Sequence, residues 1–412
     1  MKNFFTQIHH NLWQVFKYHR KTLLSLFGVF FILYSTYPMV RSATESLFID
    51  IYGASSAPKA WLMSVFALMG IISLYNYSLA RFGLKKIYAA TTIVTFVSFL
   101  LFPYLIHLGF KWLVYPLYVW KECYMVLLIH LSLAYCNEYF SFEQAKVLYG
   151  PMGAIGSIGT IIGGAFGGYV TNSWGTNGVF VFGGVFLFLS IFFFSGLNEL
   201  FKTDSTSKSS PPLNTLGGVK SYVISIIVVV ALSQFCINIV NFEFKQFLGQ
   251  QFLGDLNGKT RYLSFLYSAV GAVTLIFQAV VVPVVLTKFK HRSIHLLIPV
   301  IYFLVAFAAF GLGALPLVSL AITFLLYKAL DYSIFSSAKE MLYFSLESAQ
   351  KVGAKYLTDM MSYRFSKALI SCFLIFVQNF NILNILLVCF FILWILCVFR
   401  IFALQAKLTR ES

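Results

Sequence analysis

Long apolar segments alternate with short polar connections along most of this chain. Twelve of them reach the ~20 residues with which a helix spans the ~30 Å hydrocarbon layer of a membrane. They cover residues 22–40, 60–80, 86–107, 112–136, 147–170, 177–197, 221–244, 262–286, 294–313, 315–336, 356–377 and 382–404. The pattern predicts an all-α polytopic membrane protein with about 12 transmembrane helices.

The longest polar interruption, residues 198–220, is rich in Ser, Pro and Gly and follows the sixth apolar segment. We therefore predict two six-helix halves, 22–197 and 221–404, joined by a cytoplasmic and mobile linker. Residues 405–412 would form a cytoplasmic tail. Residues 1–21 are aromatic and basic and lack a small-residue cleavage site, so we expect a cytoplasmic interfacial helix and no signal peptide.

Composition agrees with a membrane protein, since 59% of the residues are hydrophobic, 11% are charged and the mean hydropathy is +0.82. The net charge of +16 comes from Lys and Arg scattered between apolar segments. That distribution indicates membrane topology and argues against nucleic-acid binding. The 6 cysteines lie within apolar segments without a C-x-x-C pair, so we expect no disulfide framework, no metal site and no cofactor.

The basic residues also predict the orientation of the chain in the membrane. With both termini inside, 20 Lys and Arg fall on the cytoplasmic side, 6 on the outer side and 4 within the apolar segments, which recovers the total of 30. Cytoplasmic loops carry the excess of positive charge in membrane proteins. We therefore expect a cytoplasmic N-terminus and a cytoplasmic C-terminus.

The charges inside the apolar segments are the candidate functional residues, because an ionised side chain at mid-bilayer costs ~2.5–3.5 kcal/mol. Lys328 and Asp331 are three residues apart, as are Arg364 and Lys367, so each pair shares one helix face. Either the charges neutralise one another or an anionic solute lies between the helices, and their number favours the solute. The predicted substrate-binding residues are Arg41, Lys121, Glu122, Lys245, Lys328, Asp331, Arg364 and Lys367.

A second set of charges lies at the predicted cytoplasmic ends of the helices. Glu138 and Lys146 follow the fourth apolar segment, and Lys339 and Glu340 follow the tenth. Ion pairs at such positions can form in one conformation of a transporter and break in the other. We predict that these four residues belong to an inner gate.

Two stretches resemble the ATP/ADP translocase family, the nucleotide transporters of plastids and intracellular bacteria. DYSIFSSAKEMLYFSL, at 331–346, resembles the family's KYSLFDPTKEMAYIPL signature, and the spacing of the charged residues from Lys351 to Lys367 matches the segment that follows it. NEYFSFEQAKVLYGPMG, at 137–153, is similar to NEITTVEEAKRFYPLFG. The glycines after it, from Gly153 to Gly168, lack a phosphate-loop context and predict close packing of helices.

The resemblance implies a major-facilitator-like fold of two six-helix halves, with the solute held between the halves at mid-membrane. It implies exchange or import of ATP, ADP or a related nucleotide by alternating access, in a bacterial inner membrane, with nucleotide binding and no covalent chemistry. Thr44, Trp61 and Asp331 occupy positions at which the family has lysine. These departures weaken the expectation of a di- or triphosphate substrate and leave the fold expectation unchanged.

Other functions remain open on the sequence. One alternative is a major-facilitator carrier of another anionic or zwitterionic solute, with proton coupling through Glu122 or Asp331. Another is a structural membrane protein without transport activity. An enzyme is disfavoured because the sequence has no metal-ligand cluster, no G-x-S-x-G and no paired carboxylates beside a nucleophile. The expected partners are a small anionic solute, preferably a nucleotide, and the lipid bilayer, and no nucleic acid. The sequence leaves the oligomeric state open, a monomer included.

Overall fold

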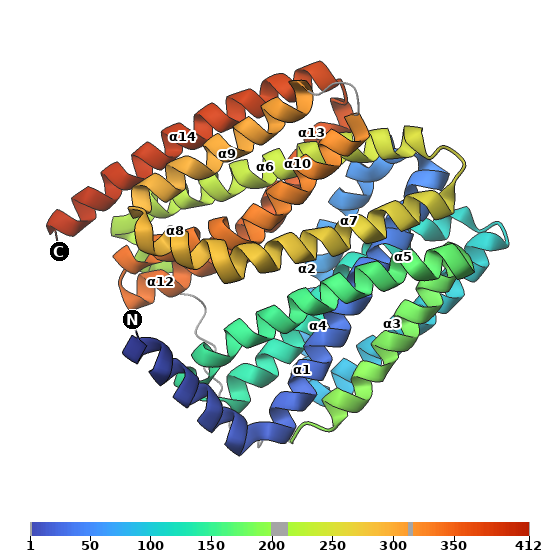
Figure 1. Cartoon of the computed structure of the whole chain (residues 1–412), viewed down its shortest axis with the longest axis horizontal. Helices are drawn as coiled ribbons and strands as arrows, with labels where there is room; N and C mark the ends of the chain where they lie inside the picture. The colour runs from blue at the N-terminus through green and yellow to red at the C-terminus, as the bar shows by residue number, and fades with distance from the viewer. Residues whose placement is uncertain (1, 199–212, 312–315, 412) are drawn as a thin grey trace. The chain divides into compact units, whose positions relative to one another are not determined.

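The computed structural model describes the backbone of residues 2–198, 213–311 and 316–411, and this part of the chain is almost entirely helical and has no strand (Figure 1). The predicted all-α class is confirmed. Most of the predicted linker, residues 199–212, lies outside the described residues, so its mobility stays a prediction.

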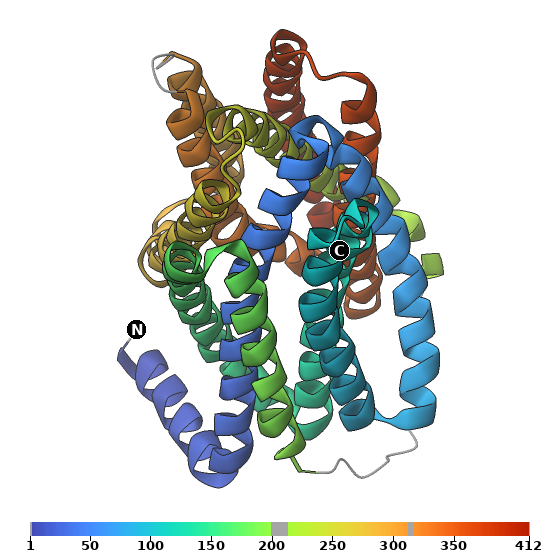
Figure 2. The same cartoon turned by 90° about the vertical axis from the view of Figure 1, so that its right-hand side faces the viewer.

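Helix α1 (Lys2–Tyr52) begins with a segment that bends away from the rest of the helix (Figure 2). The bend falls at His19, whose φ of −116° and ψ of 24° are not helical. It lies close to the end of the predicted interfacial segment, residues 1–21. The apolar part of α1 then runs to Tyr52 and is long enough to cross a membrane.

The backbone contacts divide the chain into two compact units. Unit 1 contains Met1–Ile51, Phe66–Ser205 and Phe252–Ala272. Unit 2 contains the other three segments, Tyr52–Val65, Thr206–Gln251 and Val273–Ser412. Each unit therefore includes a segment from the other half of the sequence. The predicted half boundaries at 197 and 221 stay a prediction.

In unit 1, α3 packs against α4 and α5 (Figure 1). The helices that contribute to the unit are α1, α2 (Ala57–Phe82), α3 (Leu84–His107), α4 (Val114–Tyr139), α5 (Phe142–Ser195) and α7 (Leu256–Ile276). The short 3₁₀ turn of unit 1 is η2 (Lys111–Leu113), whereas η1 (Ala54–Ser56) belongs to unit 2.

Helix α5 contains two predicted spans, 147–170 and 177–197. Its 54 residues would extend about 80 Å at 1.5 Å per residue, more than twice the thickness of the hydrocarbon layer. Gly175 interrupts the helix with a φ of 68° and a ψ of −176°, a conformation that only glycine adopts readily. The break lies between the two predicted spans and separates two helices.

Small residues let the helices of unit 1 approach closely. A Cβ atom on Gly163 would lie 1.9 Å from the carbonyl oxygen of Ser35 in α1. A Cβ atom on Gly164 would lie 2.7 Å from the backbone nitrogen of Ser268 in α7. Neighbouring glycines of α5 thus contact two different helices. The predicted packing role is confirmed at these positions.

In unit 2, α6 packs against α10, α13 and α14, and α9 packs against α10 and α14 (Figure 1). The α-helices are α6 (Lys220–Gln251), α8 (Val282–Lys288), α9 (His291–Gly311), α10 (Pro316–Leu330), α11 (Ser336–Leu342), α12 (Ser348–Lys355), α13 (Tyr363–Phe376) and α14 (Phe380–Glu411). The 3₁₀ turns are η3 (Leu213–Val219) and η6 (Tyr343–Ser345).

Three π-helical segments interrupt the helices of unit 2. They are η4 (Phe277–Val281), η5 (Asp331–Phe335) and η7 (Tyr356–Ser362). Such segments are rare and occur often at functional sites. Two of the three contain an acid from the part of the sequence, residues 331–367, that resembles the translocase family: Asp331 in η5 and Asp359 in η7.

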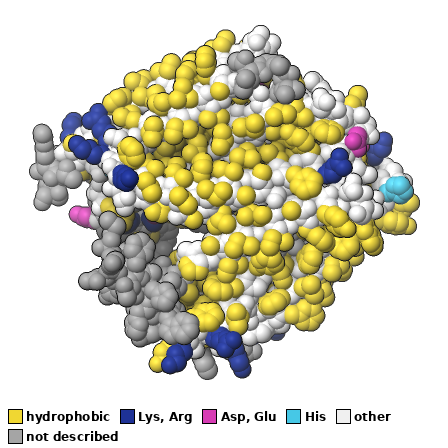
Figure 3. All heavy atoms as spheres, viewed as in Figure 1, with side chains coloured by type: hydrophobic (Ala, Val, Ile, Leu, Met, Phe, Trp, Pro, Cys, Tyr) yellow, Lys and Arg dark blue, Asp and Glu magenta, His cyan; other side chains and the backbone are white. Residues whose placement is uncertain are grey.

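Among the described residues, ten helices are long and apolar enough to cross a membrane. Two features account for the difference from the twelve predicted spans. Helix α5 counts once although Gly175 divides it, and the span 356–377 is split into η7, with 7 residues, and α13, with 14. Apolar side chains cover most of the face drawn in Figure 3, as expected for a surface in contact with lipid.

We predict that Gly163→Ala destabilises the protein, because the new Cβ atom would overlap the backbone of α1. Overpacking of this kind typically costs ~1–3 kcal/mol. Gly150→Ala is the matched control on the same helix, since nothing lies within 4 Å of its added Cβ atom. Thermal unfolding of the purified proteins in detergent measures the difference. Equal unfolding temperatures for the two variants would contradict the close packing of α5 against α1.

Candidate functional site

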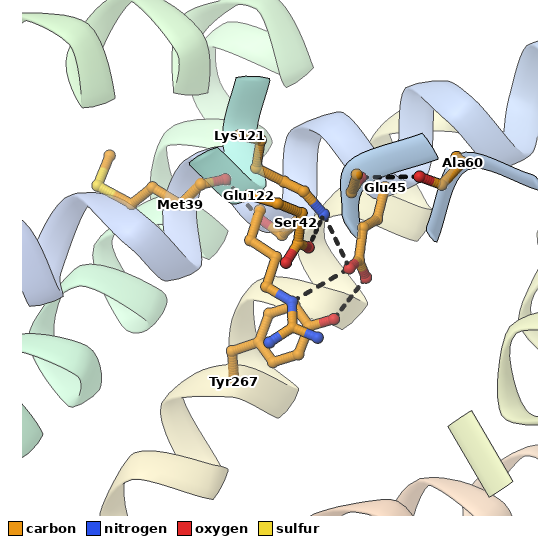
Figure 4. A network of polar contacts seen from close by, with 9 residues as sticks. Met39, Ser42, Glu45, Ala60, Lys121, Glu122 and Tyr267 are labelled. Atoms are coloured by element: carbon orange, nitrogen blue, oxygen red, sulfur yellow. Dashed lines mark hydrogen bonds and ion pairs between the residues drawn. The ribbon is translucent and has the colours of Figure 1, made fainter. Parts of the chain in front are cut away.

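The carboxylate of Glu45 is the centre of a polar cluster in unit 1 (Figure 4). Its Oε1 atom accepts hydrogen bonds from Arg41 Nε at 3.1 Å and from Lys121 Nζ at 3.3 Å. Its Oε2 atom accepts a hydrogen bond from the Tyr267 hydroxyl at 2.5 Å. These side chains come from α1, α4 and α7, so one carboxylate connects three helices.

The cluster is buried and its charges balance. Lys121 and Glu45 are almost fully buried, and Lys121 also forms an ion pair with Glu122 at 2.9 Å. Two cations, Arg41 and Lys121, therefore meet two carboxylates. Because each ion has an opposite charge beside it, the cost of removing it from water is partly offset.

Aromatic rings add to this compensation. The Arg41 guanidinium lies 4.4 Å from the centre of the Tyr267 ring, and Lys121 Nζ lies 3.8 Å from that of Tyr118. A desolvated cation over an aromatic face gains up to about 2 kcal/mol. The two cations of the cluster, Arg41 and Lys121, thus contact aromatic rings as well as carboxylates.

Helix α7 presents a polar stripe toward α1 and α5. Ser264 Oγ lies 2.6 Å from Ser42 Oγ of α1, and Thr260 Oγ1 lies 2.8 Å from Thr176 Oγ1 of α5. With Tyr267, these residues recur at three- and four-residue spacing, which places them on one face of the helix. The stripe positions Tyr267 for its hydrogen bond to Glu45.

One turn beyond the cluster, a second ion pair connects α1 with α7. Lys259 Nζ lies 2.5 Å from Asp50 Oδ1, and Lys259 is buried. Asp50 is five residues after Glu45, so both acids of this part of α1 have partners on α7. The contact between the two helices is electrostatic as well as steric.

In unit 2, Asp331 and Lys328 lie on consecutive turns of the α10–η5 helix. Gln234 Nε2 of α6 donates a hydrogen bond to Asp331 Oδ1 at 3.3 Å. Lys328 Nζ lies 5.1 Å from the centre of the Tyr332 ring. Asp331 is buried, whereas Lys328 is partly exposed.

The remaining three predicted substrate residues lie on α6 and α13. Lys245 is buried near the C-terminal end of α6, with Nζ 5.0 Å from the centre of the Trp61 ring. Arg364 and Lys367 are both partly exposed on α13. Within α6, α10, η5 and α13, four cations (Lys245, Lys328, Arg364 and Lys367) therefore stand against two acids (Glu243 and Asp331), apart from Lys220 at the start of α6.

The predicted gate residues differ in what surrounds them. Lys339 of α11 forms an ion pair with Asp359 of η7, and Glu340 forms one with Lys355 of α12. Glu138 is exposed at the end of α4. The side chain of Lys146 lies outside the described residues. The ion pairs therefore connect α11 with the segment that precedes α13.

The structure brings together only part of the predicted set in each unit. Arg41, Lys121 and Glu122 meet in unit 1, whereas the other five belong to unit 2. Sequence reasoning did not select Glu45 or Tyr267 as site residues. Glu45 had a signal, because it follows Arg41 by four residues and shares its helix face. Tyr267 had none, since tyrosine is common throughout the chain.

Comparison with known proteins identifies the family to which this fold belongs. The family model of the Major Facilitator Superfamily matches residues 22–345. "ADP,ATP carrier protein 1" of Chlamydia muridarum is 23% identical over 87% of this chain and 82% of its own length. "ADP,ATP carrier protein 3" of Rickettsia prowazekii is 22% identical over 89% of both chains. The predicted resemblance to these carriers is confirmed, at a divergent level.

Solved structures agree on the fold. A crystal structure of a variant of the nucleoside transporter NupG covers 93% of this chain and 99% of its own, with a TM-score of 0.65 and 14% sequence identity. At this identity the likeness concerns the fold alone. The helices described above thus adopt the fold of a transporter.

We predict that Glu45→Gln destabilises the protein, because the buried Lys121 and the partly exposed Arg41 lose their shared carboxylate. Breaking a buried pair typically costs ~3–5 kcal/mol, and the loss should be smaller here because Lys121 keeps Glu122. The double variant Glu45→Gln with Lys121→Met should lose less than the sum of the single changes. Thermal unfolding in detergent measures all three variants. Strictly additive losses would show that the two side chains are not coupled.

Proposed function

The chain belongs to the Major Facilitator Superfamily and is a membrane transporter, and from this premise we propose that it carries a nucleotide, such as ATP or ADP, by alternating access. The proposal rests on the charge of unit 2, where four cations within apolar helices exceed the two acids beside them. An anionic solute would supply the missing negative charge. Unit 1 has no such excess, because its cluster is balanced.

The residues of α13 are the best suited to bind the solute. Arg364 and Lys367 are three residues apart and both are partly exposed. An arginine can grip a phosphate with two parallel hydrogen bonds, which a lysine cannot do. We therefore assign the principal contacts with the solute to these two side chains. Lys245 and Lys328 add positive charge from α6 and α10.

The names of the relatives support a nucleotide over other anions. Both similar carriers are named for ADP and ATP. The lysines absent at Thr44 and Trp61 limit this argument, because fewer cations are available for a chain of phosphates. A carrier of another anionic or zwitterionic solute is the competing proposal, and the choice between them is a matter of measurement.

The ion pairs of α11 fit the role of an inner gate. Lys339–Asp359 and Glu340–Lys355 connect α11 with η7 and α12, the segment leading into α13. Since α13 carries Arg364, a change in these pairs would move a proposed binding residue. We propose that Lys339 and Glu340 act with Glu138 and Lys146 in controlling access from the cytoplasm.

For localisation, we propose a bacterial inner membrane with both termini in the cytoplasm. The support is the distribution of Lys and Arg, with 20 on the proposed cytoplasmic side and 6 on the outer side. The relatives named above are bacterial proteins, from Chlamydia and Rickettsia. No further assembly partner is needed for this proposal.

Uptake measurements test the proposed substrate. Intact cells that express the protein should accumulate labelled ATP or ADP from a panel that also contains nucleosides, nucleoside monophosphates, sugars and amino acids. Preloaded vesicles containing the purified protein should exchange internal for external nucleotide. Uptake of a non-nucleotide solute alone would favour the competing carrier, and no uptake of any solute would favour a structural protein.

In the same assay, Arg364→Lys should weaken solute binding while the protein remains folded and inserted. The expected loss is ~1.5–3 kcal/mol, the typical value of a hydrogen bond to a charged group. Arg400→Lys on α14 is the matched control, because Arg400 is exposed and has no proposed contact with the solute. If Arg364→Ala and Asp331→Ala together restored transport that each change alone removed, Arg364 would be a partner for the acid and not for the solute.

The proposed topology predicts that cysteines introduced between 198 and 220 react with membrane-impermeant reagents from the cytoplasmic side alone. The native cysteines must be replaced first, since Cys372 and Cys389 are exposed. A cysteine at Asp255, in the proposed outer loop after α6, is the control and should react from outside. Labelling of the linker from outside in intact cells would reverse the orientation.

A further inference from the structure

Glu243 is a buried acid that the proposed mechanism does not use. It lies on α6, eight residues before the end of the helix at Gln251, and is only 1% exposed. Neither carboxyl oxygen has a hydrogen-bond partner among the described residues. Oxygen atoms that accept no hydrogen bond in an apolar interior are rare and call for an explanation.

The other buried acids of the described chain differ from Glu243 in this respect. Glu45 accepts hydrogen bonds from Arg41, Lys121 and Tyr267. Asp331 accepts one from Gln234. Both are thus supplied with donors suited to a negative charge. Glu243 has none of these donors, so its surroundings do not favour the ionised form.

An ionised carboxyl group without a donor is expensive inside a membrane protein, whereas the neutral carboxylic acid is tolerated. We propose that Glu243 is a proton-binding site, and that its proton uptake and release are coupled to carriage of the anionic solute. The proton enters from water on the side to which the site is open and leaves to water on the other side. It bonds to one carboxyl oxygen, and no other bond forms or breaks.

The groups around Glu243 connect it with the proposed solute site. Helix α6, which carries Glu243, packs against α10, which carries Tyr327 and Lys328. Phe244 stacks on Phe324 of the same helix, with ring centres 5.8 Å apart. Other charged or titratable groups on α6 and on the elements packed against it include Cys236 and Lys245 of α6, Asp359 of η7, and Tyr363, Arg364 and Lys367 of α13. Asp331 of η5 is linked to α6 by its hydrogen bond from Gln234.

The sign of the coupling follows from the charge count. With both acids ionised, four cations and two acids in α6, α10, η5 and α13 give a net charge of +2. A proton on Glu243 leaves one ionised acid, so the net charge becomes +3. Binding of an anion then becomes more favourable when the proton is bound, and by linkage the anion favours proton uptake. Solute and proton would therefore move in the same direction.

This inference rests on the proposed function, and the experiment is arranged to separate the two. Purified protein in sealed vesicles is given labelled ATP or ADP, first with internal unlabelled nucleotide at equal pH and then with an inward pH gradient of one unit. A dye trapped inside reports proton entry. One unit is equivalent to about 1.4 kcal/mol, so coupling to one proton supports about tenfold accumulation.

The decisive variant is Glu243→Gln, which has nearly the shape of the protonated acid and cannot release a proton. It should retain exchange at equal pH and lose both gradient-driven accumulation and nucleotide-induced proton entry. Asp255→Asn is the matched control, because the same chemical change occurs at an exposed acid just after α6. Proton entry that persists in Glu243→Gln, or accumulation driven by sodium in place of protons, would overturn the proposal.

A second measurement is independent of the solute. Infrared difference spectra of the purified protein between neutral and alkaline pH, where exposed carboxyl groups stay ionised, should contain the band of a protonated carboxyl group, and Glu243→Gln should lack it. If wild-type protein transports no nucleotide yet this band is present and lost in the variant, the proposed substrate is wrong and the proton site stands. A band unchanged by the substitution shows that Glu243 does not bind the proton.

Discussion

An ion within an apolar helix bundle must be compensated, and the two units meet this constraint differently. In unit 1, the carboxylate of Glu45 accepts hydrogen bonds from residues of three helices, and the four charges of this cluster, its own included, sum to zero. In unit 2, the cations of α6, α10 and α13 outnumber the acids. A cluster whose positive and negative charges balance needs no ligand to compensate them. A group of helices with excess positive charge, in contrast, favours binding of an anion. Under the proposed function, this contrast favours a structural role for the cluster of unit 1 and a binding role for unit 2.

The spans could be predicted from the sequence because a membrane requires about 20 apolar residues for each helix, whatever the helix contacts. The break in α5 between its two spans was foreseen for the same reason, although its location at Gly175 was not. The π-helical segments at Asp331 and Asp359 left no mark in the hydropathy. In η5, the carbonyl oxygen of Tyr332 accepts a hydrogen bond from the amide of Gln278, a contact between distant residues that hydropathy does not reveal.

The sequence could predict only those residues of the candidate site whose charge is costly in or beside an apolar segment. Lys121 stood out because cations are rare in apolar segments, and Arg41 because it directly follows one. The contact of both cations with Glu45 was not predicted. Nor was the contact of Glu45 with Tyr267, which lies 222 residues away along the chain and carries no charge. Glu243 presents the opposite case. The sequence shows an acid two residues from Lys245 and suggests a pair, but residues two apart in a helix point to different faces, and burial without a donor appears only in three dimensions.

The departures from the carrier motifs fit this division of roles. Thr44, where the related family has lysine, is buried on α1 directly before Glu45. A lysine at this buried position would add a cation to α1 on a different helix face from Glu45, and that charge would need a counter-ion or a ligand there. Threonine adds no charge. The positive charge left for a solute is then that of α6, α10 and α13, where a proton on Glu243 alters the balance by one unit. Under the proposed function, the absence of a lysine at Thr44 and the burial of Glu243 act in the same direction, since both leave the strength of anion binding to unit 2.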